Sequence, residues 1–312
     1  MNNLIDTFVT IFPLVLYMLV GVGVKKAKIL DDSAMQQINS LVFRLFLPLS
    51  IFNNIYSSEL GDVNPGPVVL YALIFNVVLF ILAWIYFARF EKIRARRGVM
   101  IQASFRSNFV LFGMSLSMLL LDGTGTGIIE ILLAVIIPLF NVMAVLALQY
   151  YGEEKTSPAK ILRGILVNPL IIAVLIGLLV KTGGIVIPSY LKGPIASMGE
   201  IASPLALIVL AGQFNFHQSA DYMSELIIGV SVRLIIVPVL ALLGAILLGF
   251  RGEVLIAYLA LFASPLAVSS YTMAQQIGGD HELAGQVLVY TTVFCSFTIF
   301  AFIFFLKQFA FI

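Results

Sequence analysis

The stretch GVMIQASFRSNFVLFGMSLSMLLL, residues 98–121, is long and apolar enough to cross a bilayer, yet its middle holds arginine, serine and asparagine. A second stretch of this kind, VLIAYLALFASPLAVSSYTMAQQ at residues 254–276, carries Ser264 and Pro265 near its centre. A membrane helix needs about 20 mostly apolar residues, and proline removes one of its backbone donors. Each stretch is therefore predicted to be a membrane helix that breaks near its middle.

The composition of the whole chain places these stretches in a helical membrane protein. Of 312 residues, 61% are hydrophobic and only 11% are charged, against about 25% charged residues in soluble domains. A net charge of +2 and a single cysteine, Cys295, indicate neither a nucleic-acid partner nor a disulfide scaffold. His, Cys and acidic residues are not spaced as metal ligands, and we recognise no catalytic triad or phosphate-binding loop. We expect no enzyme, no metal and no cofactor.

Ten apolar segments are predicted to span the bilayer. Their approximate bounds are 4–24, 35–56, 67–88, 98–121, 128–150, 161–180, 190–211, 223–248, 254–276 and 283–306. Lys and Arg gather in cytoplasmic loops of membrane proteins. Eleven follow spans one, three and five, and only four lie at the opposite side: Lys181, Lys192, Arg251 and Lys307. We therefore expect both termini to lie outside the cytoplasm.

The two halves of the chain resemble each other. A shift of 156 residues superposes residues 13–49 on the second half with 10 identities in 37 positions. Pro48 then falls on Pro204, and Asn108 falls on Ser264. These matched positions predict an internal repeat.

The repeat defines two units, 1–156 and 157–312, with five predicted spans each. Because five is odd, the second unit must enter the membrane from the opposite side. The expected fold is an all-α polytopic membrane protein of ten helices in two inverted repeats, a plan common in secondary transporters.

The breaks in the fourth and ninth spans mark the candidate binding site. Transporters bind substrates where discontinuous helices meet near mid-membrane, and a half-helix that begins there offers free N–H groups to a carboxylate or phosphate. The candidate substrate-binding residues are Arg106, Ser107, Asn108, Ser264, Pro265 and Ser269, and the helix-breaking residues are Gly113 and Pro265. A plainer interpretation stays open, in which the serines bond to their own helices and the proline only kinks one.

Three further charged residues lie within predicted spans. Arg44 and Glu200 occupy the same repeat position, so they could form an ion pair, or Glu200 could carry a coupling proton or sodium ion. Arg233 lies in the middle of span eight, where an arginine is costly and needs a partner or a substrate. The same alternative, substrate contact or a structural ion pair, applies to Arg106.

Three motifs carry a resemblance to a known family. They are Phe105-Arg106-Ser107-Asn108-Phe109 with Gly113 in span four, Ala263-Ser264-Pro265-Leu266-Ala267 in span nine, and Phe46-Leu47-Pro48 with Asn53-Asn54 in span two. In this combination the chain resembles the auxin efflux carrier family, in its bacterial branch, over essentially its whole length. Met114-Ser115 replaces the Ile-Pro that often follows the span-four glycine, so the break should rest on Asn108, Gly113 and Ser115.

The resemblance implies a fold like that of the sodium/proton antiporters. Spans 1, 2, 6 and 7 would form a scaffold with Pro48 and Pro204, and spans 3–5 and 8–10 a transport domain that moves as an elevator. It also implies transport of organic anions such as malate, malonate or an auxin-like acid, with Asn53 among the contacts. The expected partners are this anion, the lipid bilayer and a second copy in a homodimer, and the expected location is the bacterial inner membrane.

Three alternatives belong to other functional classes. A sodium-coupled, bile-acid-like symporter shares the fold and the charge of the substrate. A cation/proton antiporter needs an acid at the crossed helices, and neither residues 98–121 nor residues 254–276 contain one at their break. A receptor would not need matched helix breaks.

Overall fold

The computed structural model describes residues 2–57, 66–113, 116–117, 120–121, 127–152, 163–164, 166–214 and 216–312. Within these ranges the regular structure is helical, and no β-strand is present. The helices are α1 (Asn2–Lys26), α2 (Asp32–Leu41), η1 (Val42–Phe46), α3 (Leu47–Ser57), α4 (Gly66–Phe90), α5 (Arg94–Phe105), η2 (Phe109–Gly113), α7 (Gly127–Tyr151), α9 (Pro169–Thr182), α10 (Ser189–Gln213), η3 (Phe216–Tyr222), α11 (Met223–Ser231), η4 (Val232–Ile236), α12 (Val237–Leu247), α13 (Glu253–Ala263), α14 (Ser269–Ile277) and α15 (His281–Gln308).

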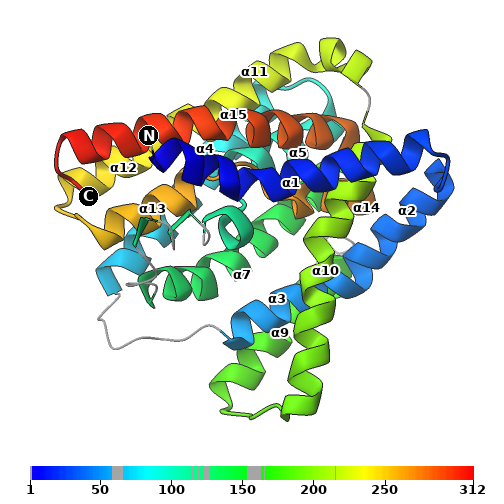
Figure 1. The fold of residues 1–312 in the computed structure, drawn as a ribbon, viewed down its shortest axis with the longest axis horizontal. Helices are drawn as coiled ribbons and strands as arrows, with labels where there is room; N and C mark the ends of the chain where they lie inside the picture. The colour runs from blue at the N-terminus through cyan, green and yellow to red at the C-terminus, as the bar shows by residue number, and fades with distance from the viewer. Residues whose placement is uncertain are drawn as a thin grey trace.

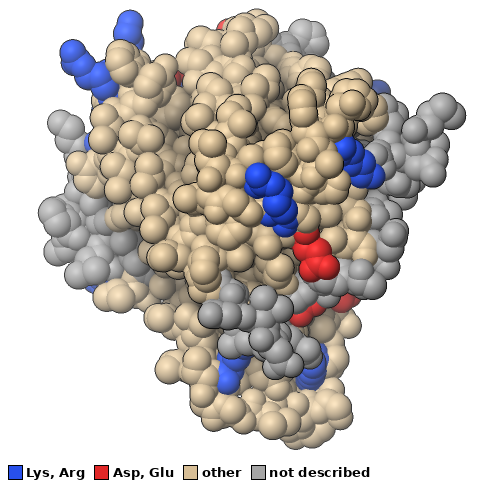
Figure 2. Space-filling view, turned by 90° about the vertical axis from the view of Figure 1, so that its left-hand side faces the viewer, with Lys and Arg blue, Asp and Glu red and all other residues tan. Residues whose placement is uncertain are grey.

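Six helical stretches of the described residues are long and apolar enough to cross a membrane, judged by length and composition. They coincide with predicted spans two, three, five, seven, eight and ten. Two shorter apolar helices, α9 and α13, lie in predicted spans six and nine. The face drawn in Figure 2 carries few charged side chains, which agrees with a surface that contacts lipid. The chain is thus a polytopic helical membrane protein.

The helices pack in two groups. In the first group, α1 lies along α10, and α3 packs against both α9 and α10. In the second group, α5 packs against α4 and α7, and α12 packs against α13. Figure 1 shows α3, α9 and α10 projecting downward from the rest of the molecule, with both chain termini on the left-hand side. The first group contains predicted spans one, two, six and seven.

Two helices contain a wide turn just before a proline. Both η1 and η4 are π-helical, and the residue after each donates its N–H to the carbonyl five residues earlier. Pro48 and Pro238 follow immediately and have no N–H to donate. A π-turn is one way to accommodate a lost helical bond. Pro204, in contrast, lies inside the continuous helix α10.

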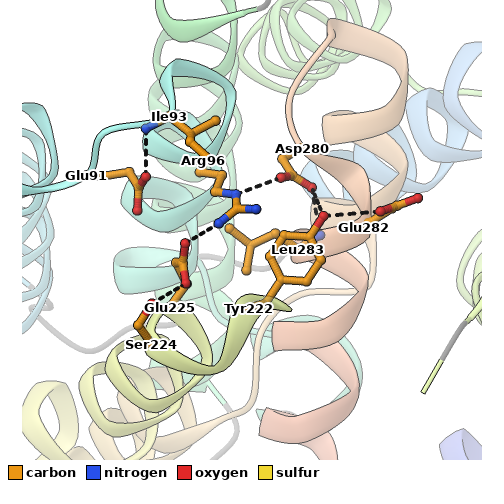
Figure 3. Close-up of polar contacts among 9 residues, drawn as sticks. All are labelled: Glu91, Ile93, Arg96, Tyr222, Ser224, Glu225, Asp280, Glu282 and Leu283. Atoms are coloured by element: carbon orange, nitrogen blue, oxygen red, sulfur yellow. Dashed lines mark hydrogen bonds and ion pairs between the residues drawn. The ribbon is translucent and has the colours of Figure 1, made fainter. Parts of the chain in front are cut away.

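A cluster of charged side chains ties α5 to α11 and to the start of α15 (Figure 3). Arg96 of α5 pairs with Glu225 of α11, and its Nε donates to Asp280 at 3.2 Å. Its guanidinium lies over the Tyr222 ring, 4.4 Å from the centroid, and the Tyr222 hydroxyl donates to Asp280 and Glu282. Burial alone would lower the pKa of the Arg96 guanidinium. Its hydrogen bond to Glu225 and the charges of Glu225 and Asp280 outweigh burial and raise the pKa above its ordinary value. The cluster therefore holds α5, α11 and the start of α15 together.

This charged cluster marks one end of the molecule, which we call the basic end. It contains the turns at 27–31, 91–93 and 278–280, next to Lys25 and Lys26 of α1. The turns at 91–93 and 278–280 lie together, because the Asp280 N–H donates to the Ala95 carbonyl. Predicted loops with few cations, such as 183–188 and 248–252, belong to the opposite end.

Candidate functional site

Both polar spans are broken in the structure, as their residues predict. Helix α5 ends at Phe105, and Arg106 has extended backbone (φ −82°, ψ 107°). Helix α13 ends at Ala263, and Ser264 is likewise extended (φ −60°, ψ 148°). The chain becomes helical again at η2 and at α14. Span nine is therefore made of two half-helices separated by a few extended residues, and in span four the described residues beyond the break begin with the short helix η2.

The two extended segments meet and hold each other. Ser107 and Leu266 form an isolated antiparallel β-bridge, and the Asn108 N–H donates to the Pro265 carbonyl at 2.8 Å. Backbone groups freed at membrane depth must find partners inside the protein. Here each break supplies partners for the other, so the two half-helix pairs cross at this point.

Gly113 has a different role from the predicted one. It lies at the end of η2, five residues beyond Asn108, and therefore does not make the break. A Cβ at this position would approach the Ala260 carbonyl oxygen to 2.8 Å and the Phe109 ring to 2.5 Å. Glycine is needed because η2 packs directly on α13. Ser115, the other predicted breaking residue, lies outside the described residues.

A cavity of about 160 Å³ lies beside the crossing. Its polar lining comes from α3, α7, α10 and the two breaks: Ser50, Asn53, Asn54, Arg106, Ser107, Asn108, Asn141, Glu200, Ser203 and Ser269. Six of the predicted site residues are in this set, although they are separated by up to 216 positions in the sequence, from Asn53 to Ser269. The break segments and the first helix group thus enclose one common site.

Arg106 dominates the charge of this cavity. Its side chain is only 4% exposed, and its Nη2 donates to Asn141 Oδ1 at 2.9 Å and to Ser269 Oγ at 2.8 Å. Its Nη1 is buried and has no partner, and the neighbouring Ser107 Oγ is also buried and unpartnered. Unsatisfied buried donors are rare in native proteins. A bound anion would satisfy both groups.

Asn108 and Asn141 complete the polar wall. Among the described residues, the Asn108 side-chain amide has no hydrogen-bond partner, and its residue is 6% exposed at the cavity. Asn141 donates its Nδ2 to Ile137 of its own helix, which turns Oδ1 towards Arg106. Sequence reasoning missed Asn141, because a lone asparagine in the apolar run of span five has no distinguishing neighbour. Asn141 fixes the direction of the guanidinium.

Helix α14 begins at the cavity. Ala267, Val268 and Ser269 all line it, and α14 starts at Ser269. Two of its first N–H groups, those of Ser270 and Tyr271, already donate to the carbonyls of Ala267 and Val268, so α14 contributes to the cavity through its helix dipole, which is positive at this end. Together with Arg106, this helix start gives the cavity a positive potential.

Other predicted site residues lie away from the cavity. Ser264 donates to the Ala260 carbonyl of its own helix, and the Pro265 carbonyl is used by the crossing. Arg233 is fully buried against backbone carbonyls and does not line the cavity, so its predicted contact with substrate is wrong. For these three residues the structural alternatives describe the structure better than substrate contact does.

The predicted ion pair between Arg44 and Glu200 is also wrong. None of the salt bridges among the described residues joins them. Arg44 is exposed on the π-turn η1, whereas Glu200 lines the cavity from α10. Equal positions in two repeats do not bring side chains together unless the repeat axis passes between them.

Between the cavity and the basic end, neutral polar side chains join α14, which follows the second break, to α2 and α10. Thr272 donates to Asn39 Oδ1 at 2.9 Å, and Tyr271 donates to Gln213 Oε1 at 2.6 Å. The Asn39 amide also donates to Gln275. We call this set the amide network: Asn39, Gln213, Tyr271, Thr272 and Gln275. These residues lie nearer the basic end of α2, α10 and α14 than the cavity lining does, so the network lies between the cavity and that end.

An apolar bundle with two crossed broken helices and a buried, partly unsatisfied cation beside them defines a helical membrane transporter. The sequence matches the membrane transport protein family over residues 6–303, nearly the whole chain, and the protein belongs to this family. The match agrees with the resemblance to the auxin efflux carriers. The search of curated proteins finds no match. Proteins of this family are membrane transporters and not enzymes.

Proposed function

We propose that this protein is a secondary active transporter of small organic anions, such as malate, malonate or an auxin-like acid. The observation that carries the proposal is the buried pair of unpartnered donors, Arg106 Nη1 and Ser107 Oγ, at the cavity. A carboxylate accepts from guanidinium and hydroxyl groups in charge-assisted hydrogen bonds. The Asn108 amide adds donors, and the dipole of α14 adds partial positive charge, without adding a full charge.

The size of the cavity favours a small substrate. At about 160 Å³, it is smaller than the ligand pockets of about 300–1,000 Å³ that hold drug-sized molecules. This argues against a bile-acid-like substrate, which is the nearest alternative. The break segments contain no acidic residue, which argues against a cation/proton antiporter.

The transport cycle we propose is of the elevator type. The ten spans would form two inverted five-helix repeats, 1–156 and 157–312. The group of α1, α3, α9 and α10 would be the fixed scaffold, and the group that carries both breaks would move past it with the substrate. The strongest packing lies within each group, and the amide network between them consists of neutral groups that can exchange partners with water. This division supports rigid-body motion of one group.

Glu200 is the residue we propose for coupling. It is the one carboxylate among the lining residues of the cavity and belongs to the first helix group. An ionised Glu200 would repel an anion held by Arg106, and binding of a proton or a sodium ion would remove that repulsion. The driving force would then be an ion gradient, with no bound cofactor.

We place the protein in a bacterial inner membrane as a homodimer, with both termini outside the cytoplasm. The first helix group offers the dimer surface, because α9 and α10 expose large apolar side chains such as Leu179 and Tyr190. The amide network would then close the cytoplasmic side, so that the cavity is accessible from outside.

Uptake into proteoliposomes tests the proposal. Purified protein is reconstituted, and accumulation of radiolabelled malonate and malate is measured with an imposed proton or sodium gradient. Accumulation that needs a gradient and is lost in Arg106→Ala supports the function. If neither acid binds or accumulates, while an organic cation does, the proposed substrate class is wrong.

A further inference from the structure

Arg233 occupies an unusual position for a buried charge. It lies on the π-turn η4, and its side chain is 0% exposed. Its Nη1 donates to the Ser104 carbonyl at 3.2 Å, and its Nη2 donates to the Phe262 carbonyl. None of the ion pairs among the described residues includes Arg233. A cation in an apolar interior is held here by backbone oxygen atoms from two other helices.

The two acceptors are the last-turn carbonyls of the two half-helices that end at the crossing. Ser104 is the residue before the end of α5, and Phe262 is the residue before the end of α13. In a continuous helix each carbonyl would accept from the N–H four residues later. Those N–H groups are diverted, because Asn108 donates to Pro265 and Leu266 donates to Thr291 Oγ1. Arg233 therefore satisfies two carbonyls that the breaks leave without helical donors.

The charges also balance. The C-terminal end of a helix carries a partial charge of about −0.5, so two ends that converge supply about −1. One guanidinium supplies +1. We infer that Arg233 is the positioning residue of the crossing, which neutralises both helix ends and holds the two breaks in register for anion binding.

Only the part of this inference that concerns anion binding rests on the proposed function. Arg106 is two residues beyond Ser104, so the helix ends that Arg233 neutralises lie close to the anion site. Without Arg233, their negative potential would oppose the positive potential that attracts the substrate. The hydrogen bonds of Arg233 go to Ser104 and Phe262, which do not line the cavity, so Arg233 acts through the helix ends.

The sequence around Arg233 explains how it reaches both helices. The π-turn places an extra residue in one turn of the helix, and Pro238 provides no N–H to restore the regular pattern. Leu234, the next residue on this turn, is 1% exposed and purely apolar. It is a matched control, because its loss affects packing of the same turn without changing charge.

The test uses full-length protein in lipid nanodiscs and two independent measurements. Hydrogen–deuterium exchange over residues 103–110 and 262–268 reports the crossing without any ligand. Malonate binding by calorimetry reports the anion site. The variants are Arg233→Met, Arg233→Lys and Leu234→Ala, each compared with wild type and checked for its melting temperature.

In Arg233→Met we expect the backbone amides of both segments to exchange hydrogen about 10- to 100-fold faster than in wild type, because two buried carbonyls lose their donor. Arg233→Lys keeps the charge but lacks the two-pronged guanidinium, so its exchange should lie between wild type and Arg233→Met. Leu234→Ala should lower the melting temperature without this paired effect. Unchanged exchange in Arg233→Met, or a lysine variant no better than methionine, would overturn the inference. If wild type binds no malonate while the exchange results hold, the proposed substrate class fails and the positioning role stands.

Discussion

Replacing Asn141 with aspartate tests the anion site at nearly constant size. Asn141 Oδ1 already accepts from Arg106 at 2.9 Å, so a carboxylate oxygen can take its place and keep the guanidinium where it is. The adjacent positive charge keeps the new carboxyl ionised. The variant changes the net charge of the site by one unit, and it also removes the Nδ2 donor to the Ile137 carbonyl, a loss that a leucine at this position shares.

The size of the effect follows from the geometry. An anion bound at Arg106 Nη1 would lie roughly 6 Å from the new carboxylate, and at an effective dielectric of about 20 the repulsion is about 3 kcal/mol. This corresponds to about a 100-fold rise in the dissociation constant. Asn141→Leu is the matched control, because it removes the acceptor without adding charge. The loss of one neutral contact should weaken binding by only about three- to ten-fold.

The measurement is malonate binding to purified protein by calorimetry at low salt and neutral pH, with melting temperatures as a check of folding. We expect Asn141→Asp to bind far more weakly than Asn141→Leu. An aspartate variant that melts like wild type and binds malonate as tightly would refute the reasoning, since no anion could then depend on the charge of Arg106.

Three further predictions concern other parts of the site and the topology. Asn108→Ala should weaken malonate binding by about 0.5–3 kcal/mol with unchanged expression, and Asn108→Asp should be weaker still; equal binding in the aspartate variant and wild type would place the site elsewhere. Glu200→Gln should bind malonate roughly three- to ten-fold more tightly than wild type at neutral pH, because it removes the negative charge that lines the cavity; a glutamine variant that binds malonate no better than wild type contradicts the coupling role. In a Cys295→Ala background, Val186→Cys should react with an impermeant thiol reagent added outside whole cells and Lys92→Cys should not, and the reverse pattern would invert the proposed orientation.

The broken helices could be predicted from the sequence because the cause is local. Serine, asparagine and proline weaken helical bonding where they cluster within an apolar span, and in the structure the chain leaves the helix within two residues of Asn108 and at Ser264. The residues that follow the breaks were also predictable as cavity residues. Ser269, beyond the second break, lines the cavity, and so does Asn53 of α3, which only the family resemblance implied.

The roles of Arg233, Asn141 and Gly113 depend on three-dimensional neighbours and could not be predicted. Arg233 donates to carbonyls 129 and 29 positions away, and a sequence contains no sign that these carbonyls lack helical donors. Asn141 acquires its role only from the guanidinium of another helix. Gly113 looked like a breaking residue, because glycine at a helix break and glycine at a close helix contact have the same sequence signature.

The amide network has a consequence for the kinetics of transport. Its members are uncharged, and each hydrogen bond contributes only about 0.5–1.5 kcal/mol net, since water replaces the partner when the two groups separate. In the transport cycle proposed above, the network would therefore act as a reversible latch between the cavity and the basic end, weak enough to open by thermal motion. Its strength should be nearly independent of ionic strength, because no ion pair within it is screened. Any dependence of the transport rate on salt would then originate at the anion site and not at the latch.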